Sequence, residues 1–296
     1  MRSDGARLLH YGGPPLFILL WSSGFIFVAI GLRSIDPLTF LAVRYALVEA
    51  LLIPAALVLR VPWPRSAMAW LHLAVIGVLV QATHFAGINL ALELGLAPGA
   101  AAMVTSLQPI LVGLLAPWLA GEAVSPRRWL GLALGLAGAV VVILSRSALG
   151  GLPVWGLACA VAALAGLTLG TLYERRFGIR QHPIAASIVQ CGAAWLLVTP
   201  LAVLLEPMRI ELTGGLVLSM TYLVLANSIV AITLLLAMVR AGEASRVSAL
   251  FFLVPPVTAM LAWGVLGQRL PLAGWAGLAV SAAGVAVVTL ERRRRA

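Results

Sequence analysis

Five polar side chains stand inside long apolar stretches of this chain, and their types could bind a solute or carry a proton. They are Arg44, Glu49, Gln81, His84 and Asn227. An ionised side chain at bilayer depth costs about 2.5 to 3.5 kcal/mol on insertion scales, so each of these residues should face protein or a water-filled cavity. A carboxyl or an imidazole there can exchange protons, whereas an amide or a guanidinium can hydrogen-bond a ligand.

Arg44 and Glu49 lie five residues apart in one apolar stretch. On a helix this spacing rotates the side chains by about 140°, so they do not share a face and cannot form a simple local pair. Arg44 is either a structural clamp on helix-end carbonyls and neighbouring side chains or a contact for substrate. Glu49 is either a proton-binding group or a structural carboxyl that is protonated or paired.

The composition requires a membrane around these residues. Of the 296 residues, 62% are hydrophobic and only 10% charged, which is too little polar surface for a soluble globule. A bilayer-spanning helix takes about 20 apolar residues. We therefore expect an all-α integral membrane fold of ten transmembrane helices, which occupy the following stretches: 8–32, 37–59, 66–92, 94–121, 129–145, 147–173, 181–205, 212–239, 247–268 and 270–290.

The basic residues give this topology an orientation. All twenty are arginine. If the N-terminus is cytoplasmic and sides alternate at every span, most of them, including the run 292–295, fall on the cytoplasmic side, as the positive-inside rule requires. The opposite side receives Arg33, Arg146, Arg209 and Arg269. We therefore expect both termini in the cytoplasm.

The net charge of +10 predicts topological anchoring, with binding of anionic lipid as the alternative, and no nucleic-acid partner. Cys159 and Cys191 both fall within expected spans, where small packing residues are the simplest interpretation. The expected partners are a small-molecule substrate and the lipid bilayer, with the protein a monomer or homodimer. We expect no cofactor and no metal site.

The second half of the chain repeats the first. A shift of 146 residues aligns the halves without a gap, and the identical pairs include Pro109/Pro255, Trp129/Trp275 and Gly138/Gly284. Each half holds five expected spans, an odd number, so the second copy is inverted. The sequence thus predicts two five-helix repeats, 14–145 and 154–290, of the kind that supports alternating access in transporters.

The repeat maps Gln81 onto Asn227, so two amides occupy symmetry-related positions near the middle of the membrane. They are either the polar lining of a central cavity or interhelical hydrogen-bonding groups. The same alternatives hold for His84, which shares a helix face with Gln81 and is also a candidate for proton coupling, with Glu49. The full set of cavity-lining candidates is Trp21, Arg44, Gln81, His84, Thr105, Gln108, Asn227 and Ser228.

The prolines predict where helices bend, and the glycines predict where helices pack closely. Pro109, Pro255 and Pro256 fall near the centres of the fourth and ninth spans, where proline frees a backbone carbonyl, at Thr105 and Phe251. Kinks are expected there, either structural or gating. Small-residue faces on the fifth and tenth spans should pack closely, within the monomer or across a dimer. Their members are Gly131, Gly135, Gly138, Gly277, Ser281 and Gly284.

Several stretches together resemble the drug/metabolite transporter superfamily, in particular its ten-helix EamA-type permeases. They are 20–25 (LWSSGF), 37–45 (PLTFLAVRY), 106–109 (SLQP) with Gly121-Glu122, and 253–256 (LVPP) with Gly267-Gln268. The family usually has Gly-Glu at the last position, so the second carboxylate is absent. The resemblance implies a multi-pass protein of the bacterial inner membrane that transports, and often exports, amino acids or related metabolites.

These observations together predict a secondary transporter of a small organic metabolite. No glycine-rich phosphate loop is present, and the chain has no lysine to complete one. The alternatives are a flippase for a lipid or lipid-linked sugar and, less favoured, an intramembrane enzyme. For the enzyme no catalytic constellation is found, because the four histidines are dispersed, so we expect no catalytic residues and no enzymatic activity.

Overall fold

The computed structural model describes residues 2–120, 126–147, 153–178, 181–231, 234, 238 and 253–295. Within these residues the regular secondary structure is helical, apart from an isolated antiparallel bridge between Ile35 and Ile210. Two segments, η1 and η2, are π-helical. In chain order the elements are α1 (Arg2–Gly31), α2 (Pro37–Val58), α3 (Ala67–Ile76), η1 (Gly77–His84), α4 (Phe85–Glu93), α5 (Pro98–Thr105), α6 (Gln108–Ala120), α7 (Pro126–Ser147), α8 (Val154–Phe177), α9 (Pro183–Leu205), α10 (Gly214–Thr221), η2 (Tyr222–Ala231), α13 (Val254–Leu266) and α14 (Leu272–Arg295).

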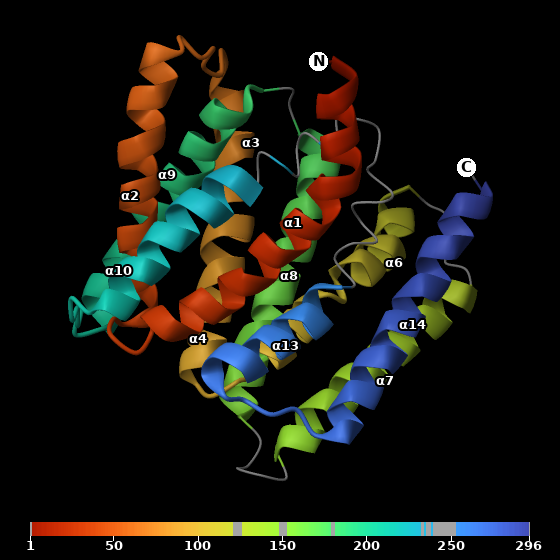
Figure 1. Ribbon diagram of the computed structural model, residues 1–296. Coiled ribbons are helices and arrows are strands. Elements are labelled where there is room, and N and C mark those ends of the chain that lie inside the picture. The colour runs from red at the N-terminus through yellow and green to blue at the C-terminus, as the bar shows by residue number, and fades with distance from the viewer. Residues whose placement is uncertain are drawn as a thin grey trace. The chain divides into compact units, whose positions relative to one another are not determined.

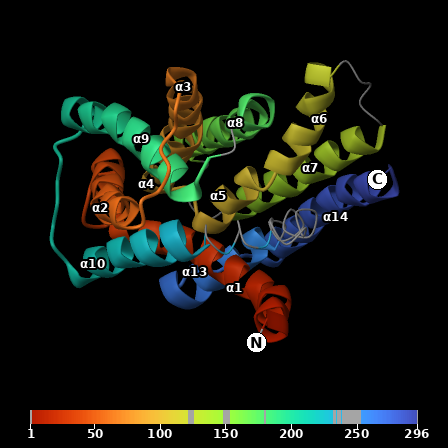
Figure 2. The ribbon, with the colours of Figure 1, turned by 90° about the horizontal axis from the view of Figure 1, so that it is seen from above.

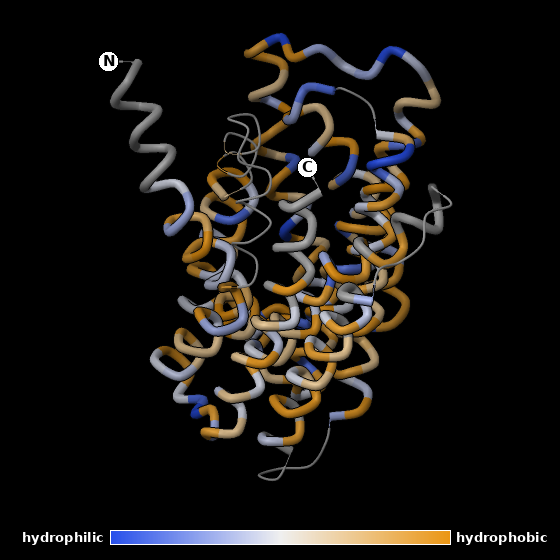
Figure 3. Tube along the Cα trace, turned by 90° about the vertical axis from the view of Figure 1, so that its right-hand side faces the viewer, coloured by the Kyte–Doolittle hydropathy of each residue, from blue (hydrophilic) through white to orange (hydrophobic). Residues whose placement is uncertain are grey.

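The helices have the length and hydropathy of membrane spans. Six are long and apolar enough to cross a bilayer, and each overlaps an expected span: 12–31, 37–58, 67–93, 154–177, 183–205 and 214–231. Four shorter apolar helices overlap the rest: 98–112, 129–142, 254–266 and 272–284. Figure 3 shows hydrophobic residues along the helices and many of the hydrophilic ones in the loops. The chain is therefore a helical membrane protein, and the count of ten spans stays a prediction.

The helices form two compact units, and each draws on both halves of the sequence. The first unit comprises 1–27, 96–154 and 225–296, and the second comprises 28–95 and 155–224.

In the second unit α2 packs along α9, as Figures 1 and 2 both show. Their shared core contains Leu41, Tyr45 and Val48 from α2 and Ala194 and Val198 from α9. Leucines on the outer faces of both helices are exposed, for example Leu57 at 64% and Leu204 at 78%. In a bilayer these faces meet lipid, which is why helices so apolar can be covered on one side only.

Glu206 holds the start of α2. Asp36 precedes this helix without capping it through its side chain. Instead, the Glu206 carboxylate, just after α9, accepts hydrogen bonds from the amides of Leu38 (2.8 Å) and Thr39 (2.9 Å) and from the Thr39 hydroxyl (2.8 Å). The first amides of a helix have no partner within it and carry a partial positive charge, so a carboxylate stabilises them.

In the first unit α7 and α14 lie side by side through their small residues (Figures 1 and 2). A side chain at Gly138 would collide with the Gly277 carbonyl and the Ser281 amide, and one at Gly284 would meet the Gly131 carbonyl. The expected small-residue faces therefore pack against each other within one chain. Backbones this close leave no room even for a methyl group.

The fourth expected span is interrupted at Ser106 and Leu107, between α5 and α6. The Leu107 amide pairs with the Val104 carbonyl at 3.2 Å, three residues back, instead of with Met103. The Ser106 hydroxyl donates to the Met103 carbonyl at 2.7 Å and so replaces the missing amide. Pro109 follows directly in the first turn of α6, where its missing N–H costs nothing.

The second half places a helix start at the equivalent residue. Gln108, the first residue of α6, maps onto Val254, the first residue of α13, under the shift of 146 residues. Pro255 and Pro256 thus lie in the first turn of α13, while Phe251 lies outside the described residues.

The C-terminal end of α13 is capped by Gly267. This residue has φ = 68°, and the next amide, that of Gln268, donates to the Ala262 carbonyl at 3.1 Å. Gly267 is therefore a left-handed C-cap, a conformation that glycine adopts without strain. The corresponding Gly121-Glu122 pair lies outside the described residues.

Replacing Gly138 by alanine should destabilise the protein by about 1 to 3 kcal/mol, because the new methyl group forces α7 and α14 apart. Thermal unfolding of the detergent-purified protein measures this as a lower Tm. Gly264→Ala on α13 is the matched control, since nothing lies within 4 Å of its added carbon. Equal Tm values for the two variants would contradict the close packing.

Glu206→Ala should lower stability by about 1 to 2 kcal/mol, the usual cost of losing a helix N-cap. Glu211→Ala serves as its control, because the Glu211 side chain is exposed and its hydrogen bonds to Ser34 and Thr213 are made by the backbone. Thermal unfolding of both variants tests this, and a Tm unchanged by Glu206→Ala would show that the carboxylate does not stabilise α2.

Candidate functional site

Arg44 is the most deeply buried charge in the described part of the second unit. It is 4% exposed, and its guanidinium carbon lies 4.9 Å from the ring centre of Phe85 on α4. The ring face is electron-rich and attracts the cation, which offsets part of the cost of burial. Beside it, the Tyr45 hydroxyl donates to the backbone carbonyl of Gln81 at 2.5 Å, so α2 is tied to η1 at this level.

His84 ends η1 and lies against the same aromatic ring. Its ring centre is 4.9 Å from that of Phe85, edge to face, and Nδ1 lies 3.1 Å from the Ala163 carbonyl on α8. A carbonyl only accepts, so Nδ1 must carry the proton, and the tautomer is fixed. His84 is 5% exposed. The Ala163 carbonyl is therefore a structural hydrogen-bond partner that ties His84 to α8.

Glu49 lies farther along α2, facing α9. Its Oε1 is 3.5 Å from the point where Gly192 would carry a Cβ. Both carboxylate oxygens are buried, and neither has a hydrogen-bond partner within the described residues.

The two π-helical segments occupy equivalent places in the two halves. Shifting η1 (Gly77–His84) by 146 residues places it inside η2 (Tyr222–Ala231), and Gln81 and Asn227 lie in these segments. A π-helix spaces its hydrogen bonds five residues apart, is rare, and is frequent at functional sites. In η1 the Thr83 hydroxyl donates to the Val78 carbonyl five residues earlier, at 2.9 Å.

The first unit holds a second group of polar side chains, between α1, η2 and α13. The Ser22 hydroxyl lies 3.4 Å from the Val254 carbonyl, and the Thr258 hydroxyl lies 3.4 Å from the Ser22 carbonyl. Asn227 donates through Nδ2 to the Leu20 carbonyl at 3.3 Å. The first two contacts join the start of α13 to α1, and the third joins η2 to α1.

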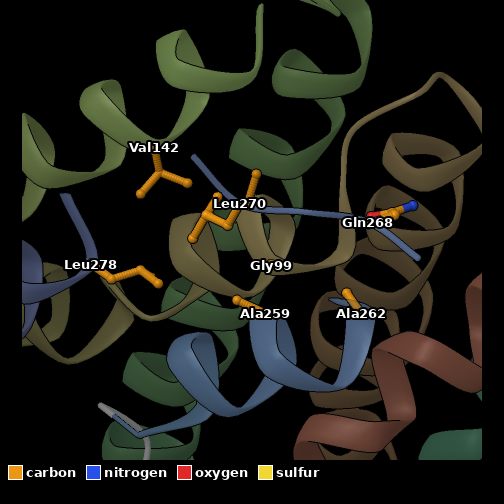
Figure 4. A pocket seen from close by; sticks show the side chains of 8 residues that line it. Gly99, Val142, Ala259, Ala262, Gln268, Leu270 and Leu278 are labelled. Carbon is orange, nitrogen blue, oxygen red and sulfur yellow. The ribbon is translucent and has the colours of Figure 1, made fainter. Parts of the chain in front are cut away.

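Two small hollows lie in the first unit, each of about 10 Å³, which is room for about one water molecule. One is shown in Figure 4; Gly99, Val142, Ala259 and Leu270 line it, and Gln268 is its one polar side chain. The other lies where α5 ends and α13 begins, and its lining includes Ser106, Pro255, Pro256 and Ser281. Neither hollow could hold a metabolite in this conformation.

The expected site residues are divided between the two units. Arg44, Glu49, Gln81 and His84 belong to the second unit, where Arg44 and His84 meet at Phe85. The remaining candidates belong to the first unit: Trp21, Thr105, Gln108, Pro109, Asn227, Ser228, Pro255 and Pro256. A cavity shared by Gln81 and Asn227 therefore stays a prediction.

Among the first-unit candidates, Thr105 bonds carbonyls of its own helix, those of Ala101 (3.2 Å) and Ala102 (3.0 Å). Trp21 packs against Phe17, with ring centres 5.5 Å apart. These two contacts hold the helices in shape and give no direct indication of a ligand.

Sequence reasoning missed Tyr45 and the contacts that Ser22 makes with Val254 and Thr258. Tyr45 directly follows Arg44 in the stretch 37–45, and a tyrosine hydroxyl within an apolar span needs a partner, so it could have been singled out. The Thr258 contact joins residues 236 positions apart and leaves no local pattern.

Comparison with known proteins gives matches over nearly the whole chain. A family model described as the EamA-like transporter family matches residues 16–144 and again 154–290. "Uncharacterized inner membrane transporter YedA" of Escherichia coli (strain K12) is 27% identical over 274 residues, covering 93% of this chain and 88% of the relative. "Probable amino-acid metabolite efflux pump" of Salmonella typhimurium (strain LT2) is 25% identical over 297 residues, covering 96% and 94%. A solved crystal structure aligns with a TM-score of 0.64 at 26% identity, covering 95% of this chain and 96% of that one.

Phe85→Leu should destabilise the second unit by about 2 kcal/mol, because the buried guanidinium of Arg44 loses the ring face beneath it. Phe85→Tyr keeps that face and is the matched comparison. Thermal unfolding in detergent distinguishes the two variants. If leucine were tolerated as well as tyrosine, the stacking would not stabilise Arg44.

Proposed function

The chain belongs to the EamA-like transporter family, and on that premise we propose that it is a secondary transporter that exports or exchanges a small organic metabolite by alternating access. It is a multi-pass protein of the bacterial inner membrane, with a small-molecule substrate. The observation that carries the proposal is the family match to both halves of the chain, with a helix start and a π-helical segment at equivalent residues in each half.

An amino acid or a related metabolite is the proposed substrate class. The name of the Salmonella typhimurium relative, an amino-acid metabolite efflux pump, supports this class. Arg44 and Phe85 in the second unit and Asn227 in the first offer groups suited to a small polar solute. The transporter names of the relatives also support the expectation that the chain is not an enzyme.

Ten spans in two inverted repeats, 14–145 and 154–290, with both termini cytoplasmic, are the proposed topology. An inverted repeat supplies two near-equivalent arrangements of one bundle, which alternating access requires. The helix starts at Gln108 and Val254 support it, because they lie at equivalent residues of the two halves. Pro109, Pro255 and Pro256 lie in the first turns of these helices and are the proposed hinge residues.

Gln81 and Asn227 are the proposed polar lining of the transport path, because each lies in a π-helical segment. The purified protein is placed in liposomes that are preloaded with a mixture of the standard amino acids, and the same amino acids, isotope-labelled, are added outside. We expect at least one labelled amino acid to enter in exchange for its unlabelled form, and mass spectrometry measures this uptake. Gln81→Ala and Asn227→Ala should each weaken the apparent affinity about fivefold, the effect of one lost hydrogen bond of about 1 kcal/mol.

The matched control for this experiment is Thr221→Ala, at an exposed position at the end of α10. This variant should transport as the wild type does. Exchange by the wild type no faster than in protein-free liposomes would contradict transport of amino acids. Unchanged affinity in both amide variants would leave the two amides outside the path.

A further inference from the structure

Glu49 is the one acid among the described residues of the second unit whose carboxylate is buried without a hydrogen-bond partner. Asn89 Oδ1 and the hydroxyls of Thr199 and Ser219 are also buried without one, but these groups do not ionise near neutral pH. Arg44 lies against a ring, Tyr45 donates to a carbonyl, and His84 is paired with a carbonyl of α8. Glu49 has two buried oxygens and, among the residues that the structure describes, no hydrogen-bond partner for either. It lies 12 residues into α2, about 18 Å from the start of that helix, and so near the middle of a span.

The surroundings of Glu49 combine a protein side and a lipid side. One turn before it, Tyr45 is 2% exposed and belongs to the core shared with α9. One turn after it, Ile53 is 41% exposed on the outer face, where a bilayer would lie. The carboxyl is turned toward Gly192, where α9 has no side chain to fill the space. It is therefore held at the seam between two helices, at the edge of the lipid.

An ionised carboxylate cannot be accommodated cheaply in such a place. Removing a charge from water without compensating hydrogen bonds costs several kcal/mol, and a titratable group avoids this by becoming neutral. The titratable and charged groups near Glu49 are Cys191 on α9 and Arg44 and Tyr45 on its own helix. His84 of η1 interacts with Arg44. The guanidinium of Arg44 is positioned over Phe85.

We propose that Glu49 binds a proton in this conformation and that this proton is the ion coupled to transport. The neutral acid stays at the seam of α2 and α9. A rearrangement that opens the seam at Gly192 admits water, and the acid then loses its proton to that side of the membrane. The proposal has two parts. The binding half, that Glu49 holds a proton, stands on the geometry; the coupling half, that this proton drives transport, rests on the proposed transport function.

A hydrophobic carbodiimide tests the binding half without a known substrate. Dicyclohexylcarbodiimide adds to a protonated carboxyl: the acid proton moves to one nitrogen, the carboxyl oxygen bonds to the central carbon, and the acyl group then shifts to nitrogen, so that nothing else is consumed or released. In proteoliposomes the peptide containing Glu49 should gain the mass of one carbodiimide, and the label should decline as pH is raised. Glu49→Gln should lose this label, whereas Glu174→Gln should keep it, since Glu174 is exposed near the end of α8.

The coupling half is measured on the same proteoliposomes with the mixed amino-acid pool. Exchange without a gradient tests the proposed function, and accumulation driven by an imposed proton gradient tests Glu49. Glu49→Gln should retain exchange and completely lose the gradient-driven accumulation, while Glu174→Gln should retain both.

Three results would overturn parts of this account. Wild-type Glu49 that stays unlabelled at every pH would show that no proton is bound there. Gradient-driven accumulation by Glu49→Gln equal to the wild type would exclude the coupling role even if Glu49 is labelled. Absence of exchange by the wild type would count against the proposed function, and the labelling would still decide whether the proton is bound.

Discussion

A polar group inside an apolar helical bundle must find its partner within the protein, and the structure is organised around this constraint. Arg44 stacks on Phe85, His84 is paired with the Ala163 carbonyl, and the Ser106 hydroxyl replaces a missing amide where a helix is interrupted. Glu206 satisfies the first amides of α2. The two buried oxygens of Glu49 have no hydrogen-bond partner among the described residues, and the proposal that Glu49 binds a proton rests on this observation.

The same constraint explains why the irregular segments recur at the repeat distance. An interrupted or π-helical backbone leaves carbonyls that need other partners, so it persists in an apolar span only where side chains or water can supply them. The starts of α6 and α13 and the segments η1 and η2 obey the shift of 146 residues. An alternating-access transporter needs equivalent helix segments in both halves that can change conformation. The proposed function thereby accounts for the recurrence of these segments.

Much of the helical organisation could be predicted from the sequence, because hydropathy alone sets the length of a span. The stretches expected at 37–59, 66–92 and 181–205 correspond to helical segments at 37–58, 67–93 and 183–205. The glycines predicted closely packed faces on the fifth and tenth spans, but the structure was needed to show that these two faces meet within one chain. The π-helical segments, the Glu206 cap and the Ser22–Thr258 contact could not be predicted, because they depend on residues far apart in the sequence or on backbone geometry without a compositional pattern.

The central proposal is that Gln81 in the second unit and Asn227 in the first both line the transport path, which opens to each side of the membrane in turn. The most direct measurement is the reactivity of single cysteines, Gln81→Cys and Asn227→Cys, in a chain whose Cys159 and Cys191 are replaced by alanine. The account predicts that a membrane-impermeant thiol reagent modifies both positions from either side, and that a transported amino acid slows the reaction at both. Modification of either position from one side only, or from neither, would contradict it.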